Sequence, residues 1–131
     1  MNDAAEYIST IRQMIVLHPY VRYFQVVREE EQGNSGLLRF RLTLTDGGLL
    51  ELSERFRVID GEVRPLKYRF HWQDRNGQLI ARWDMAPHHL ALPTFPHHIH
   101  DGAEENILPH APVSLADVLA LISRRLQTEH R

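Results

Sequence analysis

The sequence contains no cysteine among its 131 residues. It can therefore form neither a disulfide nor a thiolate metal site, and its composition suits a reducing cytosol. No apolar run of about 18 residues occurs, which gives no candidate membrane span, and residues 1–10 are too acidic and polar for a secretory signal. The formal net charge is only −2, so no global positive charge attracts nucleic acid. We expect a cytoplasmic protein in which any basic surface arises from local arrangement.

Apolar residues make up 43% of the chain and charged residues 24%, which are ordinary values for a globular protein. The length suffices for one hydrophobic core, and no linker or internal repeat divides it. The sequence therefore predicts a single domain over residues 1–131. We expect a helix at 3–17, strands at about 20–85, a histidine-rich loop at 86–112 and a helix at 114–129.

Both predicted helices have apolar side chains at helical spacing. These side chains are Ala4, Ile8, Ile11 and Ile15 in the first helix, and Leu115, Val118, Leu119, Ile122 and Leu126 in the second. Asp3 and Ser114 are suitable N-caps. His18 precedes a proline, which ends the first helix.

Between the helices the apolar period changes to two, which is typical of strands. The predicted strands are 20–31, 37–45, 49–59, 62–73 and 78–85, and short turns rich in glycine separate them. Because every link is short, sequence neighbours should pair. The expected fold class is α+β, with a five-stranded antiparallel meander sheet and the N- and C-terminal helices packed on one face.

The strand alternation separates an apolar face from a basic face. The apolar face comprises Leu38, Phe40, Leu42, Leu44, Leu50, Leu52, Phe56, Val58, Leu66, Tyr68, Phe70 and Trp72. The basic face comprises Arg39, Arg41, Arg55, Arg57, Lys67, Arg69 and His71, and Arg82 and Asp84 join it if the fifth strand pairs in the matching sense. Such clustering is typical of proteins that bind phosphate-bearing ligands. The alternative is a solvated outer face whose arginines pair with Glu51 and Glu54.

The segment 82–101 is the strongest candidate for function, because it contains His88, His89, His97, His98 and His100. Histidine exchanges protons near neutral pH, so two of them could act as base and acid at a phosphodiester. Arg82, Lys67 and Arg69 would then hold the phosphate oxygens. Asp84 would orient a histidine, and Trp83 is a candidate for stacking on a base. Tyr68 faces inward in this register and is a weaker candidate.

Two other interpretations of the histidines remain open. His98 and His100 lie on one side of an extended segment, and with Asp84 they could bind a divalent metal ion. Alternatively, some of the histidines are structural and bond loop carbonyls that no strand satisfies.

Residues 68–100 resemble the TumE family of toxins from bacterial and archaeal toxin–antitoxin pairs. The similar segments are YRFHWQ at 68–73, RWDMAPHH at 82–89 and TFPHHIH at 94–100. Met85 stands where the family pattern has asparagine, and Ile99 where we expect a basic residue. The resemblance implies a small toxin that a cognate antitoxin neutralises, with RNA cleavage as the usual activity of such toxins.

The leading hypothesis is a toxin that acts as a metal-independent ribonuclease with no cofactor. One alternative is a nuclease that degrades a cyclic oligonucleotide signal in CRISPR antiviral defence. Others are a metalloenzyme and a non-catalytic module that binds RNA or protein. The strand predicted at 20–31 could also pair across a homodimer.

Overall fold

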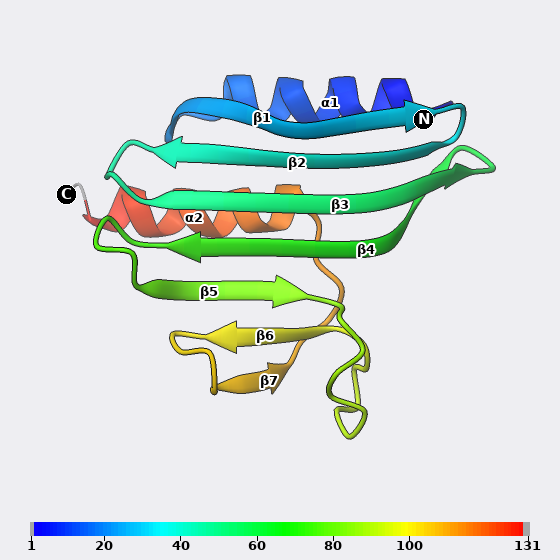
Figure 1. Ribbon diagram of the computed structural model, residues 1–131. Helices are drawn as coiled ribbons and strands as arrows, with labels where there is room; N and C mark the ends of the chain where they lie inside the picture. Colours follow the sequence, from blue (N-terminus) through cyan, green and yellow to red (C-terminus); the bar gives the residue numbers. More distant parts are fainter. Residues whose placement is uncertain (1, 130–131) are drawn as a thin grey trace.

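The computed structural model describes residues 2–129, which form an α+β fold (Figure 1). The elements in chain order are α1 (Ala4–Leu17), β1 (Val21–Gln32), β2 (Ser35–Leu44), β3 (Leu49–Ile59), β4 (Glu62–Gln73), β5 (Leu79–Asp84), β6 (His98–Asp101), β7 (Ile107–Pro109) and α2 (Leu115–Glu129). Both helices agree with their predicted bounds to within one residue at each described end. Neither is long and apolar enough to cross a membrane, within the part of the chain that the structure describes.

The sheet has seven strands in the order β1 to β7, and every neighbouring pair is antiparallel. The meander is therefore confirmed, but the predicted number of five strands is wrong. The two additional strands lie within the predicted loop 86–112. β6 has only four residues and β7 only three, and the sequence of β6, HIHD, is too short and polar to show the apolar alternation of a strand.

The hydrophobic core lies between one face of the sheet and the two helices. Figure 1 shows α1 and α2 behind the same face, and His18 at the end of α1 contacts Ser123 of α2 through a 2.8 Å Nε2–Oγ hydrogen bond. Phe40, Phe56 and Phe70 project from the strands into this core and are almost fully buried. The hydrophobic alternation of β2 to β4 thus determines which face the helices cover, and it leaves the opposite face open.

Two residues depart from the predicted faces. Leu66 is 49% exposed, because the pairing shifts between Arg55 and Phe56 and makes Leu66 the extra residue of a β-bulge. Glu54 lies on the apolar face and is buried, where it accepts a 2.6 Å hydrogen bond from the Tyr7 hydroxyl. Glu54 therefore does not pair with the outer arginines, whereas Glu51 does.

Candidate functional site

The open face of the sheet carries two rows of polar side chains that cross the strands. Directly paired residues of antiparallel strands project to the same side, so the strand register defines the rows. One row comprises Arg41, Glu51, His71, Arg82 and His100, and the other comprises Arg39, Ser53, Arg69, Asp84 and His98. β6 thus places His98 and His100 in line with the basic residues of the earlier strands. The predicted conditional placement of Arg82 and Asp84 on this face is confirmed.

Asp84 at the end of β5 is the centre of the polar contacts. Its Oδ1 lies 2.9 Å from Nε2 of His98 and accepts the Ala86 N–H at 3.0 Å. Its Oδ2 lies 3.6 Å from Nε2 of His100 and 3.6 Å from Nε of Arg82. Asp84 is buried and contacts both histidines, so its carboxylate is well placed to orient the two imidazoles.

Backbone carbonyls form hydrogen bonds with Nδ1 of both His98 and His100. Nδ1 of His98 lies 3.0 Å from the carbonyl oxygen of Pro96, and Nδ1 of His100 lies 2.8 Å from that of Glu104. A carbonyl only accepts, so each Nδ1 carries a proton. Each Nε2 is thereby turned toward Asp84, and the His98–Asp84 contact brings two acceptors together unless a shared proton or another cation lies between them.

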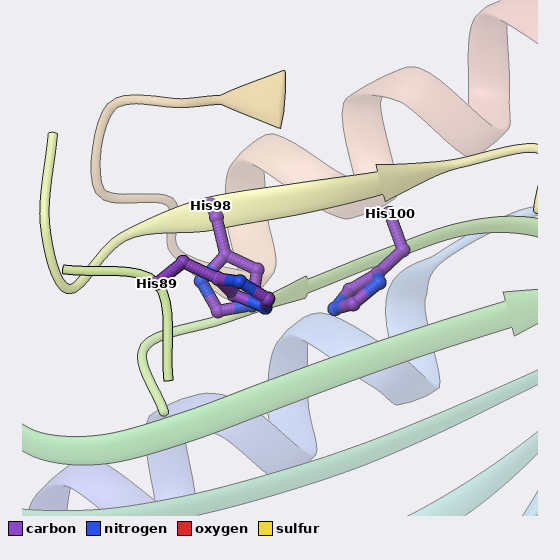
Figure 2. A group of neighbouring side chains, drawn as sticks. All are labelled: His89, His98 and His100. Carbon is purple, nitrogen blue, oxygen red and sulfur yellow. The ribbon is translucent and has the colours of Figure 1, made fainter. Parts of the chain in front are cut away.

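His89 approaches His98 and His100 from the loop after β5 (Figure 2). Its ring centroid lies 4.8 Å from that of His98 and 6.2 Å from that of His100. One ring nitrogen from each of the three histidines lies within 4.8 Å of the other two. Desolvation lowers the pKa of His89, and the charges of His98, His100 and His88 lower it further, so His89 favours the neutral form.

Arg82 forms an ion pair with Glu104, which lies in the connection between β6 and β7. Two guanidinium nitrogens of Arg82 donate to the two carboxylate oxygens of Glu104. This hydrogen bonding raises the pKa of Arg82 and lowers that of Glu104. Arg82 therefore positions β5 against the β6–β7 connection rather than presenting a free cation as the sequence predicted. Glu104 lay outside every recognisable motif, so sequence reasoning missed it.

Two adjoining pockets occupy the open face. The first, of about 310 Å³, is lined by Lys67, Tyr68, Arg69, Arg82, Asp84, Ala86, His88, His89, His98 and His100. The second, of about 340 Å³, shares Lys67, Tyr68 and Arg69 with it and extends to Arg39, Glu51, Leu52, Ser53, His71 and Gln73. Lys67 and Arg69 are exposed and form no ion pair with any residue in 2–129. They are therefore available to an anionic ligand beside the histidines.

Some of the predicted phosphate contacts lie apart from the histidines. Arg41 is paired with Glu51 through a 3.0 Å Nε–Oε1 contact. Arg55 and Arg57 line a separate pocket with Glu30 and other residues of the β1–β2 hairpin. The arginines of this face thus divide between paired and available groups.

Three further candidates differ in their access to the pocket. His88 is exposed at its mouth. Nδ1 of His97 lies 2.8 Å from the Tyr68 hydroxyl, and burial together with the charge of His98 lowers the His97 pKa. Trp83 projects to the opposite face and is only 3% exposed, so a base could not stack on it without opening the core.

Comparison with known proteins identifies one family. The family described as toxin TumE matches residues 11–127. This span includes all the site residues described above. Neither a curated protein nor a solved structure matches the chain.

Proposed function

Because the chain belongs to the TumE toxin family, we propose that it acts as a toxin by cleaving RNA phosphodiester bonds at the pocket of His89, His98 and Asp84. Membership of a toxin family also implies an antitoxin partner. The observation that carries the proposal is the continuity of the two pockets, in which Lys67 and Arg69, which form no ion pair within residues 2–129, adjoin a cluster of imidazoles. RNA supplies both groups that such a site requires, a phosphate anion and a neighbouring 2′-hydroxyl.

The binding step depends on Lys67 and Arg69. Both side chains are exposed at the boundary of the two pockets, where they would hold non-bridging phosphate oxygens and stabilise the charge that develops there. Arg39 and His71 extend the polar lining along the second pocket. A single strand could therefore cross β4 with one phosphate beside the histidines and the next nucleotides over the second pocket.

The chemical step requires one base and one acid. His89 would accept the proton of the 2′-hydroxyl as its oxygen bonds to phosphorus, because neither of its nitrogens is held by a backbone carbonyl in the described chain. The proton shared by His98 and Asp84 would pass to the 5′-oxygen as the bond from that oxygen to phosphorus breaks. The products would be a 2′,3′-cyclic phosphate and a 5′-hydroxyl. This route needs no metal ion and fails on DNA, which lacks the nucleophile.

The test is RNA cleavage by the purified, untagged protein in EDTA. We expect cyclic phosphate ends, and a loss of roughly 100-fold or more in rate for His89→Ala and for His98→Gln. Arg124→Ala is the control, because Arg124 is exposed on α2 on the far side of the sheet. A protein that cuts RNA only after a divalent ion is added would contradict the acid–base route. Unchanged cleavage by both histidine variants would contradict the site.

A further inference from the structure

We propose that His89, His98 and His100 also form a binding site for one divalent transition-metal ion with the ligand preferences of zinc. The inference goes beyond the proposed cleavage reaction and stands on the arrangement of the side chains. Their three ring nitrogens lie within 4.8 Å of one another. Figure 2 shows His98 and His100 projecting from β6 toward the same side, with His89 entering from the loop.

The hydrogen bonds at Nδ1 select the nitrogen that faces the ion. Metal-binding histidines commonly donate their other ring N–H to a backbone carbonyl, which determines the tautomer and aims the lone pair. His98 and His100 both have this arrangement, with Pro96 and Glu104 as the acceptors. In the neutral form each therefore presents an Nε2 lone pair toward the shared carboxylate of Asp84.

Asp84 strengthens the case for a cation. With both Nδ1 atoms protonated, the 2.9 Å contact between His98 Nε2 and Asp84 Oδ1 brings two acceptors together unless a proton or a metal ion lies there. A divalent ion would satisfy this contact and balance the buried carboxylate. Asp84 could then act as a fourth ligand or as a neighbouring counter-charge.

The cluster needs only a small closure to reach coordination distances. Zn–N bonds are about 2.1 Å long, so two nitrogens on one ion lie no more than about 4 Å apart. His89 can supply the movement, because it belongs to a loop and is only half-buried, whereas the strand holds His98 and His100. A set of three imidazoles and one carboxylate favours zinc, nickel, cobalt or copper over magnesium and calcium.

An ion at this site would occupy the nitrogens that the acid–base reaction uses. A metal-bound imidazole has no lone pair with which to accept a proton from a 2′-hydroxyl. Zinc should therefore inhibit RNA cleavage by the same protein.

The experiment measures ion binding without RNA. Untagged protein is stripped with EDTA, dialysed and titrated with Zn²⁺ against a chromophoric chelator. We expect one ion per chain and a rise in melting temperature with Zn²⁺ concentration. His89→Ala and His100→Gln should lower the affinity by more than the roughly 10- to 100-fold that follows from losing a group hydrogen-bonded to a ligand. The matched control is His88→Ala, which changes the exposed neighbour of His89.

Binding and cleavage give separable outcomes. Absence of stoichiometric binding would overturn the ion site, as would an affinity that His89→Ala leaves unchanged while circular dichroism shows a folded protein. A chain that binds zinc but does not cut RNA retains the ion site and loses the proposed function. A chain that cuts RNA but binds no zinc retains the proposed function and loses the ion site. Stimulation of cleavage by zinc would contradict the predicted inhibition.

Discussion

Glu54 shows how one residue links this fold to pH. Burial raises the pKa of its carboxyl group from the usual 4.5 to about 6, and the hydrogen bond from Tyr7 offsets part of that rise. The folded chain therefore holds this proton more tightly than the unfolded chain does. As pH rises from 4.5 through about 6, the unfolded state releases the proton first and the free energy of unfolding falls.

Glu54→Gln should remove this loss, because glutamine can still accept from the Tyr7 hydroxyl and carries no charge. The original chain should lose up to about 2 kcal/mol of unfolding free energy through this group as pH rises from about 4.5 to about 7.5. The variant should not lose it, so its advantage over the original chain should grow by that amount across the same range. Urea denaturation at the two pH values measures the gain. Glu51→Gln on the outer face of the same strand is the control, and an equal gain there would contradict the role of burial.

The same residue also shows a limit of prediction from sequence. The sequence suggested Glu54 as a surface partner for the outer arginines, because it is charged, whereas it lies on the buried face. Within residues 2–129, the Tyr7 hydroxyl of α1 donates the hydrogen bond that satisfies Glu54 in the core. Likewise, the sequence placed Arg82 beside Asp84, but the pairing of Arg82 with Glu104 depends on β6 and β7 folding back. Contacts across elements of this kind have no local signal.

At the scale of elements, Gly36 of β2 lets a large core side chain pack against the backbone. Gly36 is paired with Phe56 of β3, and a Cβ atom at position 36 would lie 2.4 Å from Phe56 Cζ. The Phe56 ring is buried and contacts Tyr7 edge-on. The close approach therefore couples the β2–β3 pairing to the packing of α1.

Gly36→Ala should lower the unfolding free energy by about 1–3 kcal/mol, because the buried ring or the strand must shift. Urea denaturation measures the change. Ser35→Ala is the neighbouring control, since Ser35 is exposed. Equal stability of the two variants would show that the Phe56 ring moves aside without cost.

The start of α2 is held by a reciprocal cap. The Asp117 N–H donates to Ser114 Oγ at 3.3 Å, and the Ser114 N–H donates to Asp117 Oδ2 at 2.9 Å. Ser114→Ala should lower the unfolding free energy by about 1 kcal/mol, as measured by thermal or urea denaturation. Thr128→Ala near the end of the helix should change it by less than about 0.5 kcal/mol. A similar loss in both variants would contradict a specific role for the cap.

The elements differ in how far the sequence determines them. The helices and β2 to β4 have many apolar side chains at a regular period, so their type, order and buried face were predictable. β6 and β7 are short, and pairing with β5 rather than their own sequence makes them strands. The sequence therefore indicated the histidines as a group and Asp84 as a partner for them, but the pairing of β6 with β5 that brings His98 and His100 to Asp84 was not predictable.

At the scale of the whole molecule, charge is separated although the total is nearly balanced. The net charge is −2, yet Lys67, Arg69 and Arg39 line adjoining pockets on one face. An RNA strand bound there would release counterions, so its affinity should fall as salt concentration rises. The basic face, and not the net charge, should govern this dependence.

The double variant Lys67→Ala, Arg69→Ala should reduce the slope of log affinity against log salt. The expected reduction is roughly 0.7 for each lost phosphate contact with single-stranded RNA. Fluorescence anisotropy over a salt series measures it. Arg124→Ala removes a positive charge from the helical side, and a slope change there equal to half that of the double variant would contradict a localised binding face.

The position of β6 late in the chain also has a consequence during synthesis. Lys67 and Arg69 belong to β4, whereas His98 and His100 belong to a strand that pairs only after β5 is complete. A nascent chain that has reached β5 carries the cationic half of the site without the imidazole half. Translation thus makes His98 and His100 after the cationic residues of the proposed site. A ribosome that stalls before residue 98 would release a fragment unable to perform the proposed cleavage.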